Sequence, residues 1–403
     1  MRILFITPRI PFPPRKGDQL RAFNQLKGLK QLGHDIHLIS YSDQPVPVTE
    51  ISSLCSKFFP VKFNKISAMR SMLAGMTANS PLQVSYYLSE EFRKTIKEAV
   101  QTCHYDILHT QLVRTSPYFD ELKELPNVID FVDSISLNLT RRKAFKKSII
   151  NPFLTYEAKA IQRMEKKAVQ EFDGSIFISH VDKNNVERSS PKVISISNGV
   201  DLDYFHYQHQ LPANRNLIFV GNMSYEPNRH GVHYFIEHIY PLIKQKITDF
   251  TFYVVGREPT KELIQLCKDK KDIIVTGEVD DIREYLHQSR LFICPLKTGA
   301  GVQNKVLEAM SAGVPVLTTS IVNDPIGAVD SRSAVVRDSD QDFADAVVNL
   351  LSDTEKLEEI RINARAFVEE NYHWDSLNKK LEQFYLDTIS RRNSEFGKRV
   401  ING

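Results

Sequence analysis

Cysteine is scarce in this chain of 403 residues, where it occurs only four times, at Cys55, Cys103, Cys267 and Cys294. No two of these residues stand at the short spacings that bind zinc or carry out thiol–disulfide exchange. The sequence therefore argues against a disulfide-stabilised secreted domain, a zinc module and a dithiol redox enzyme. We expect the four side chains to be small buried hydrophobes in a reducing compartment.

Long apolar runs are also missing. A membrane-spanning helix needs about 18 consecutive apolar residues, and no such run is present. The mostly apolar segment Met1–Ile6 is much shorter than a signal peptide. A cytoplasmic protein is therefore expected, with any membrane contact peripheral and at the inner face. No internal repeat is found, and no aromatic residues alternate with basic ones in a way that favours nucleic acid as a partner.

Glycine is rare where a dinucleotide cofactor would need it. Arg2–Thr7 is a nearly continuous apolar run, which is typical of a central parallel strand, and a helical pattern follows it. The loop between them, Pro8–Asp18, is rich in proline and contains only Gly17, whereas the dinucleotide-binding fingerprint has three glycines. The sequence predicts a βαβ unit that binds no nicotinamide cofactor.

Charge is unevenly distributed along the chain. The first 200 residues carry 28 Lys and Arg against 19 Asp and Glu, a net charge of +9, and the remainder carries 24 against 30. The basic half, with the cluster Arg141–Lys147, suggests contact with anionic lipid or an anionic acceptor, although uneven scatter of solvated charge explains it nearly as well. Met69 and Leu73, near several basic residues, could contact lipid or belong to the core.

The most informative stretch is Cys294–Val316, which predicts a strand, a glycine-rich turn, a short helix and a second strand. Gly299 and Gly301 lie in the turn, and the helix should begin near Gln303. A glycine turn lets the backbone approach a ligand, and the first N–H groups of a helix carry partial positive charge. This combination suits a phosphate group.

Two charged residues lie on the predicted helix. Lys305 falls in its first turn, where a cation is unfavourable for the helix dipole and needs another reason to be present. Glu308 follows one turn later and could accept two hydrogen bonds from a ribose diol. The alternative is a βαβ crossover that only packs against its sheet, with both side chains solvated.

The segment Glu308–Val316, with the sequence EAMSAGVPV, resembles the donor-site signature of the family 4 retaining glycosyltransferases. Glu308 matches the second glutamate of that signature, and Ala300 occupies the position of the first. The chain therefore resembles the branch in which the pattern Gly-x-Gly-x-x-x-Lys-x-x-Glu-Ala replaces the two-glutamate form.

This resemblance implies an α/β fold of the GT-B type, in which two Rossmann-like domains face each other across a cleft. The N-terminal, acceptor-side domain should span residues 1–205, and the C-terminal domain, which binds the donor, residues 216–372. Residues 373–403 should form a helix that crosses back to the N-terminal domain, followed by a tail. Its buried stripe is expected at Leu377, Leu381, Phe384 and Tyr385.

The resemblance also implies a site for a nucleotide diphosphate sugar, the donor substrate, with no cofactor. Asn222 occupies a position where family members usually have an arginine, and Arg229 is the nearest cation for the lysine that follows it. The nucleobase is expected near Gly256, Arg257 and Val279. The predicted nucleotide and diphosphate contacts are Gly17, Gly221, Asn222, Arg229, Gly256, Arg257, Val279, Gly301, Val302, Gln303, Asn304, Lys305 and Glu308.

Four residues of the first half are further candidates for the predicted site. Family members often have a histidine facing the donor sugar near the strand end at His109, and Gln111 competes for this role. Asp133 lies at the C-terminal end of the apolar strand Val128–Asp133. Ligands of parallel sheets bind at such strand ends, so Asp133 is a candidate for contacting the acceptor hydroxyl, together with Asp18. Alternatively, Asp133 caps the next segment. The predicted catalytic residues are Lys305, Asp133 and His109.

No metal is expected. The segments Asp201–Asp203 and Asp338–Asp340 imitate the aspartate-x-aspartate motif of a different glycosyltransferase fold, but neither follows the apolar strand that such a motif needs. Asp340 fits the start of a helix better. Both are interpreted as chance matches.

The function that follows is a retaining sugar transfer from the donor to a hydroxyl of a glycan or lipid-linked acceptor, in cell-surface polysaccharide or glycoconjugate synthesis. One alternative is a nucleotide-sugar epimerase on the same fold. A phosphorylase would need a pyridoxal lysine, for which no signature is present. The non-enzymatic alternative is a degenerate nucleotide-sugar-binding protein, because Asn222 and Ala300 replace charged groups.

Overall fold

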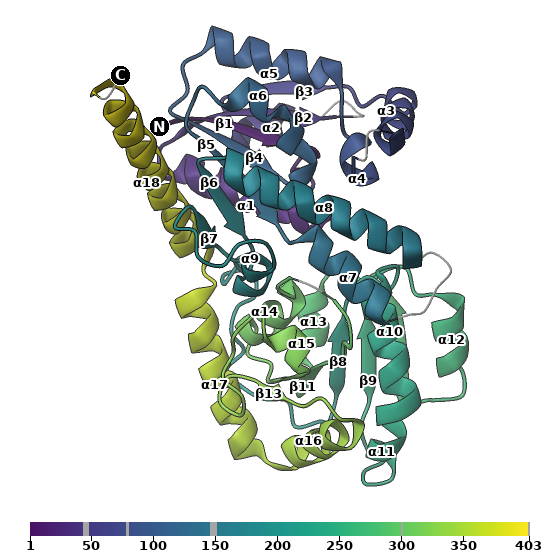
Figure 1. Cartoon of the computed structure of the whole chain (residues 1–403). Coiled ribbons are helices and arrows are strands. Elements are labelled where there is room, and N and C mark those ends of the chain that lie inside the picture. Colours follow the sequence, from purple (N-terminus) through teal and green to yellow (C-terminus); the bar gives the residue numbers. More distant parts are fainter. Residues whose placement is uncertain (43–47, 78–79, 146–150, 300, 402–403) are drawn as a thin grey trace. The chain divides into compact units, whose positions relative to one another are not determined.

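The computed structural model describes residues 1–42, 48–77, 80–145, 151–299 and 301–401 (Figure 1). The chain divides into two compact units, of which the first comprises residues 1–198 and 374–403 and the second residues 199–373. Each unit has its own parallel sheet. In the part of the chain that the structure describes, no helix is both long and apolar enough to cross a bilayer.

The described residues of the first unit form a seven-stranded parallel sheet in the order β3-β2-β1-β4-β5-β6-β7. Its strands are β1 Arg2–Thr7, β2 Asp35–Tyr41, β3 Lys57–Val61, β4 Ile107–Gln111, β5 Asn127–Val132, β6 Gly174–Phe177 and β7 Val193–Ser195. The helices are α1 Gly17–Gln31, α2 Val48–Leu54, α3 Lys65–Thr77, α4 Leu82–Ser85, α5 Glu90–Thr102, η1 Val113–Tyr118, α6 Phe119–Leu122, α7 Ile135–Phe145, α8 Asn151–Glu171, α9 His180–Val186 and α18 Trp374–Ile401.

Helices cover both faces of this sheet, so its strands are apolar on both sides. Ile3 and Phe5 of β1 belong to a core with buried residues of α1, α2 and α18. Leu4 and Ile6, which alternate with them, belong to a second core with residues of α5, η1 and α8. The period-2 alternation of a strand thus explains why a continuous apolar run is needed here.

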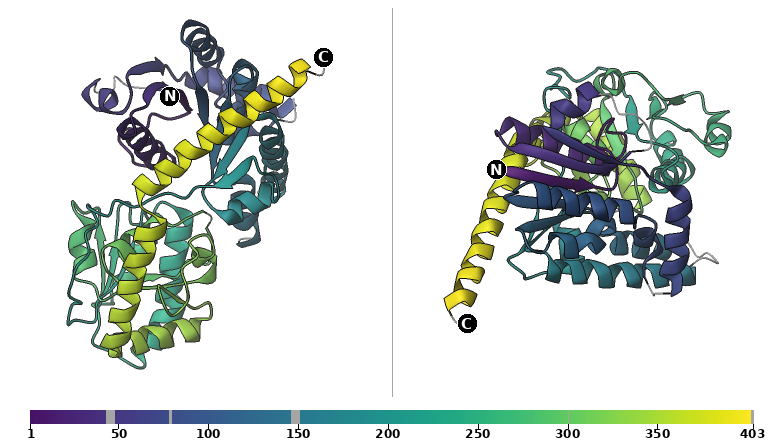
Figure 2. Two further views of the ribbon diagram at one scale, coloured as in Figure 1. Left: turned by 90° about the vertical axis from the view of Figure 1, so that its left-hand side faces the viewer. Right: turned by 90° about the horizontal axis from the view of Figure 1, so that it is seen from above.

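Helix α18 belongs to the first unit although it lies at the other end of the sequence (Figure 2). Its apolar stripe, at Leu377, Leu381, Phe384 and Tyr385, is buried. The Asn378 side-chain amide donates to the carbonyl oxygen of Asn24 in α1 at 3.2 Å. A Cβ at Gly28 would lie 1.9 Å from the Asn378 amide nitrogen, so a glycine here permits the close packing of α18 against α1.

The described residues of the second unit form a six-stranded parallel sheet in the order β10-β9-β8-β11-β12-β13. Its strands are β8 Leu217–Val220, β9 Phe252–Val255, β10 Ile273–Gly277, β11 Leu291–Cys294, β12 Val316–Thr318 and β13 Val335–Val336. The helices are α10 Glu226–Tyr234, the π-helical turn η2 Phe235–Ile239, α11 Tyr240–Lys244, α12 Lys261–Cys267, α13 Ile282–His287, α14 Asn304–Ser311, α15 Ser320–Asn323, α16 Asp340–Ser352 and α17 Thr354–Asn371.

The core of the second unit is built on β8 and β11, whose residues are almost fully buried. The Phe235 ring packs between β9 and α16, with its centroid 4.8 Å from that of Phe252 and 6.3 Å from that of Phe343. Such aromatic contacts fix the helix layer on the sheet.

Both units are doubly wound, and their strand orders reverse between β1 and β4 and between β8 and β11. The expected α/β architecture with two Rossmann-like domains is confirmed. In sheets of this kind, ligands bind outside the carboxyl ends of the strands where the order reverses. The two reversal points therefore indicate where each unit presents a binding site.

Candidate functional site

Three neighbouring strands of the second unit end in glycines, namely Gly221 after β8, Gly256 after β9 and Gly277 at the end of β10. Their backbones are joined, because the Gly221 amide donates to the Val255 carbonyl at 2.9 Å and the Gly256 amide to that of Gly277 at 3.0 Å. The strand ends therefore form one continuous edge. A Cβ at Gly277 would meet no heavy atom within 4 Å, so the edge is open there, whereas Gly221 packs against Asn228 and Gly256 packs against the backbone of Gly221.

Gly256 is required by geometry rather than by function alone. Its φ is +141°, a conformation that L side chains rarely adopt. A Cβ there would lie 2.0 Å from the carbonyl oxygen of Gly221. Because that contact is with backbone, no side-chain rotation can relieve it.

We expect Gly256→Ala to lower the free energy of unfolding by roughly 3 kcal/mol, since it combines an unfavourable φ with a steric overlap. Gly327→Ala is the matched control, because Gly327 also has a positive φ, of +76°, but open space around its Cβ position. It should cost about 1 kcal/mol, the penalty of the backbone conformation alone. Urea unfolding of both variants measures the difference, and equal costs would contradict the overlap.

The glycine turn after β11 leads directly into α14. Gly299 and Gly301 have positive φ values of +139° and +67°, as a tight turn requires. Gln303 is the N-cap residue with extended backbone, and its side chain does not cap the helix. Gly313, with a φ of +79°, comes directly after the C-cap residue of α14. Ala300, at the position of the missing glutamate, lies outside the described residues.

Lys305, in the first turn of α14, is held by residues of two other elements. Its Nζ donates a hydrogen bond to Asn228 Oδ1 on α10. The same ammonium lies 4.7 Å from the ring centroid of Phe219 in β8. Asn228 is in turn fixed by its side-chain amide, which donates to the Asn222 carbonyl at 2.9 Å. Burial lowers the pKa of Lys305, although Cys294 and Glu308 favour its charged form.

Glu308 lies one turn after Lys305 and is partly buried. Burial raises the pKa of Glu308 to about 7, and the nearby Lys305 opposes this shift. Among the described residues, neither side chain makes an ion pair within 4 Å. A cation and a carboxylate without ion-pair partners, beside a glycine turn and a helix N-terminus, form a site prepared for a polar ligand.

The structure brings most of the predicted nucleotide contacts to this edge. The Met223 amide donates to the carbonyl of Arg257 at 3.0 Å, which joins the loops after β8 and β9. Val279, in the turn after β10, is half-buried. Val302, Gln303 and Asn304 lie at the N-terminal end of α14.

Asn222 and Arg229 differ from what the sequence pattern suggests. The side-chain oxygen of Asn222 accepts hydrogen bonds from the Ser224 amide at 2.8 Å and its hydroxyl at 2.9 Å, so this group stabilises its own loop. Helix α10 begins at Glu226, with Pro227 in its first turn, so Arg229 lies within the helix. Proline favours the first helical turn because its missing N–H would have no partner there.

His109, in β4, is fully buried in the interior of the first unit. Its ring stacks on Phe5 at 4.1 Å between centroids, and its Nδ1 is 2.6 Å from the hydroxyl of Tyr385 on α18. Burial lowers the pKa of His109 to about 4, although Asp130 opposes this. These surroundings favour a neutral histidine with a structural role. Contact of His109 with the donor sugar stays a prediction.

A buried ion pair next to His109 could not be inferred from the sequence. Arg21 of α1 and Asp130 of β5 are both fully buried, with Nε and Oδ2 2.7 Å apart. Gln25 donates to the same carboxylate at 2.9 Å, and Arg21 also donates to the side chain of Asn198 at 3.1 Å. This network connects α1 and β5 with Asn198, the last residue of the segment 1–198 of this unit. The one signal in the sequence is Asp130, a charged residue within the apolar run Val128–Val132.

Asp133 follows the residue Val132, whose φ is +63°. Burial raises the pKa of Asp133 to about 6, and the neighbouring Asp182 raises it further. Its carboxylate accepts from the Asn138 side chain, which supports the alternative that it stabilises the start of α7. Nearby, burial raises the pKa of Glu165 to about 7 while Ser134 and Ser136 donate to it. Contact of Asp133 with an acceptor stays a prediction.

Gly17 and Asp18 begin α1, at the point where the strand order of the first sheet reverses. A Cβ at Gly17 would have no heavy atom within 4 Å, so the backbone there is open. Asp18 accepts from Arg9 at 2.9 Å, and its carbonyl accepts from the Gln111 side chain at 3.0 Å. Gln111, which competed with His109 in the sequence, is therefore the one of the two that is joined to the loop containing Gly17.

Asp338 and Asp340 have structural partners. Asp340 is the first residue of α16 and accepts from the Tyr234 hydroxyl at 2.6 Å. The Asp338 side chain accepts from the Ser320 amide at 2.9 Å. Both contacts belong to the packing of the second unit.

Comparison with known proteins is consistent with this geometry. Residues 214–353 match the model of the family described as Glycosyl transferases group 1. An uncharacterized 44.6 kDa protein in the cps region of Klebsiella pneumoniae is 23% identical over 389 residues, which cover 92% of this chain and 96% of that protein. A GDP-mannose-dependent phosphatidylinositol monomannoside mannosyltransferase of Mycobacterium tuberculosis is 28% identical over 158 residues, covering 36% of this chain and 41% of that protein.

Solved structures share the fold at low sequence identity. Sucrose-phosphate synthase from Thermosynechococcus elongatus has a TM-score of 0.72 at 14% identity, covering 97% of this chain and 100% of that one. Anabaena Alr3699/HepE, solved with UDP and glucose, has a TM-score of 0.64 at 15% identity, covering 95% and 98%. The chain thus has the two-domain fold of GT-B glycosyltransferases, and its residues 214–353 match the model of the glycosyl transferases group 1 family.

Proposed function

We propose that this protein is a retaining glycosyltransferase that moves a sugar from a nucleotide diphosphate donor to a hydroxyl of a glycan or lipid-linked acceptor. The observation that carries the proposal is the pair Lys305 and Glu308, which lies beside the glycine turn at the reversal point of the second sheet. This pair falls inside the segment that matches the glycosyltransferase family model. The similarity of the chain to a protein in a cps region supports a role in cell-surface polysaccharide or glycoconjugate synthesis.

Each group has a role that its surroundings suggest. Glu308 accepts hydrogen bonds from the ribose diol of the donor, and Lys305 contacts the diphosphate together with the first N–H groups of α14. Arg229 is a second cation for the diphosphate. The nucleobase binds at the loops of Gly256, Arg257 and Val279, where the backbone of three strand ends is joined.

The reaction requires the protein mainly to position the two substrates and to stabilise the charge of the leaving diphosphate. The bond between the sugar C1 and the diphosphate oxygen breaks, and the acceptor oxygen forms its bond to C1 on the same face. The acceptor proton passes to an oxygen of the leaving diphosphate. Because no carboxylate nucleophile is then required, stabilising the growing diphosphate charge becomes the main contribution of the site.

A catalytically degenerate nucleotide-sugar-binding protein is the second candidate, favoured by Asn222, whose side chain stabilises its own loop instead of offering positive charge. The two are separated by incubating purified protein with UDP-glucose and GDP-mannose and measuring release of the nucleoside diphosphate. Release supports the transferase. Tight binding without any release, with or without added acceptor glycans, supports the binding protein. Epimerisation of the donor would identify the third candidate.

We also propose peripheral association with anionic membranes through α3. Its side chains Ile66, Met69 and Leu73 are 67%, 57% and 60% exposed and share one helix face, by their spacing. Lys65 and Arg70 are exposed on the same helix. An exposed apolar stripe beside basic residues is typical of a helix that lies in a lipid interface. Part of the basic cluster Arg141–Lys147 lies outside the described residues.

Flotation with vesicles tests this proposal. Wild-type protein should float with vesicles containing anionic phospholipid at low salt and less so at higher salt, because exposed charges are screened over about 8 Å at physiological ionic strength. Leu73→Asp should reduce the bound fraction several-fold. Ile362→Asp is the control, since Ile362 is 57% exposed but lies on α17 of the other unit. Equal flotation of the two variants would contradict membrane binding through α3, as would a wild-type protein that does not float.

A further inference from the structure

Two arginines meet around one tyrosine at the reversal point of the first sheet. Arg9 lies in the loop after β1, and Arg114 lies in η1, which follows β4. The Arg9 guanidinium donates to the Tyr87 hydroxyl at 3.1 Å, and the Arg114 guanidinium lies 5.3 Å from the centroid of the same ring. The carboxyl ends of β1 and β4 thus bring two cations to the place where a doubly wound sheet binds ligands.

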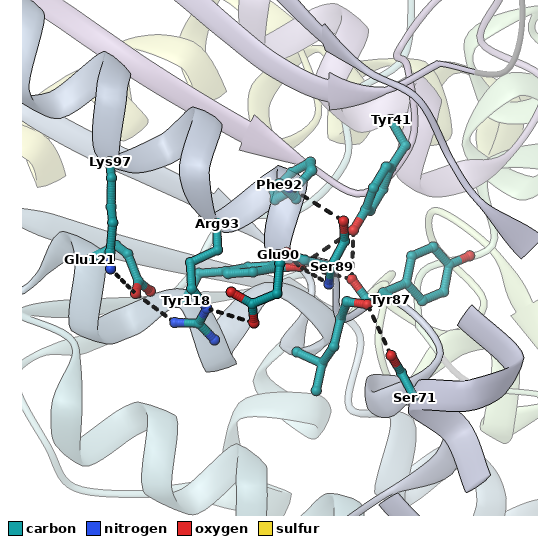
Figure 3. Close-up of polar contacts among 11 residues, drawn as sticks. Tyr41, Ser71, Tyr87, Ser89, Glu90, Phe92, Arg93, Lys97, Tyr118 and Glu121 are labelled. Atoms are coloured by element: carbon teal, nitrogen blue, oxygen red, sulfur yellow. Dashed lines mark hydrogen bonds and ion pairs between the residues drawn. The ribbon is translucent and has the colours of Figure 1, made fainter. Parts of the chain in front are cut away.

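The backbone of Tyr87 is held from the opposite side. The hydroxyls of Tyr41 and Tyr118 donate to its carbonyl oxygen at 2.7 Å and 2.9 Å. Figure 3 shows this pair of contacts and the Tyr87 ring extending away from them, with its hydroxyl at the far end. Because the backbone is fixed by two buried rings, the Tyr87 hydroxyl has little freedom and is preorganised.

The charge of these arginines is only partly balanced. Arg9 pairs with Asp18 at 2.9 Å, and its side chain is 29% exposed. Arg114 donates to the side-chain oxygen of Gln83 at 3.2 Å, but its Nε is buried without a hydrogen-bond partner. Within the described residues, no carboxylate lies within 4 Å of Arg114. A largely buried guanidinium with no carboxylate in direct contact gains stability when an anion binds to it.

The loops that carry these groups are constrained. Leu112, at the start of η1, has a φ of +66°, which is unfavourable for a residue with a side chain. This backbone conformation is stabilised by a hydrogen bond from the Leu112 amide to the Asp130 carbonyl at 2.7 Å. Burial lowers the pKa of Arg114, and repulsion by the positive charge of Arg9 lowers it further, while Tyr87, Asp18 and Asp133 oppose the shift. A shared anion would turn that repulsion into attraction.

We propose that Arg9, Tyr87 and Arg114 bind an anionic oxygen group, phosphate or carboxylate, of the acceptor. Both guanidinium groups supply paired N–H donors that match such a group, and the Tyr87 hydroxyl supplies a third donor. The acceptor assignment rests on the proposed function, whereas the anion site does not. The sugar acceptor is then a phosphate-linked or acidic molecule rather than a neutral glycan.

Calorimetric titration with inorganic phosphate tests the site without knowledge of the acceptor. Wild-type protein should bind phosphate, and both Arg9→Gln and Arg114→Gln should weaken that binding at least about tenfold, since each removes a charged donor. Arg188→Gln, an exposed arginine of the same unit that donates to the Asn184 carbonyl, is the matched control and should bind normally. Lys305→Ala should also keep this binding event, because Lys305 belongs to the proposed diphosphate site.

A second variant protects the test against misfolding. Tyr87→Phe keeps the ring and the backbone contacts and removes only the hydroxyl, so a several-fold loss of phosphate affinity is expected with an unchanged melting temperature. Glucuronate, titrated in the same way, reports on a carboxylate-bearing acceptor, and whichever of the two anions binds more tightly identifies the source.

Unchanged anion affinity in Arg9→Gln and Arg114→Gln would overturn the proposal, as would binding that is lost only in Lys305→Ala. Absence of any binding by the wild type would overturn it as well. These outcomes leave the transferase proposal standing, because release of nucleoside diphosphate from the donor is measured separately. Conversely, a protein that binds phosphate at Arg114 but releases no nucleotide supports the anion site and contradicts the transferase.

Discussion

Replacing Lys305 by alanine should lower kcat by about 10²–10³-fold, the scale known for removing one preorganised donor from a site of developing charge. Negative charge grows on the diphosphate as the glycosidic bond breaks, so a cation in contact with it stabilises the transition state more than the ground state. The Nζ of Lys305 is positioned by Asn228 and by the ring of Phe219, which suits the proposed role. Steady-state release of nucleoside diphosphate from the donor measures the effect.

Lys246→Ala is the control for this experiment. Lys246 belongs to the same unit, lies on the surface and pairs with Asp345, so its loss should leave turnover unchanged. If Lys305→Ala keeps near-normal turnover while Arg229→Ala loses it, the diphosphate charge is balanced from α10 and Lys305 is a structural residue of α14.

Glu308→Gln should weaken binding of the nucleoside diphosphate by about 1–3 kcal/mol, because hydrogen bonds from ribose to an ionised carboxylate are stronger than those to an amide. Burial raises the pKa of Glu308 to about 7 in the free protein. The carboxylate that accepts both ribose hydroxyls is therefore depleted as the pH falls through 7. We expect the affinity of the wild type to increase from pH 6 to pH 8 by more than that of Glu308→Gln.

Calorimetry with UDP and GDP at several pH values measures both effects. Titration of the diphosphate itself contributes equally in wild type and variant, so the difference between their pH profiles isolates Glu308. Parallel profiles, or unchanged affinity in a folded Glu308→Gln protein, would remove Glu308 from the nucleotide site.

Local patterns predicted the elements around the proposed donor site well. The apolar run before Gly299, the glycines of the turn and the amphipathic segment after it determine β11 and α14 through contacts that are near in sequence. The start of α10 at Glu226 has only a weak local cue, a single proline at Pro227 within a polar segment. The α/β architecture followed in the same way, from apolar runs alternating with helical patterns.

Long-range contacts were beyond the reach of local patterns. The Tyr385 hydroxyl meets His109 across 276 residues of sequence, and Arg21 meets Asp130 across 109. Such pairs give a residue surroundings that its local sequence does not indicate, since His109 is buried and contacts Phe5 and Tyr385. Local patterns also gave no indication of the cluster formed by Arg9, Tyr87 and Arg114. These residues come from three separate segments and show no shared motif.

Lys305 and Glu308 are proposed to belong to a site that cleaves the bond between the sugar and the diphosphate of the donor with retention. Proton NMR of the sugar that purified protein first releases from UDP-α-glucose or GDP-α-mannose, with water as the acceptor, tests this most directly. We expect release of the α anomer before mutarotation, together with nucleoside diphosphate, and loss of both in Lys305→Ala. Initial release of the β anomer, or release that Lys305→Ala leaves intact, would contradict it.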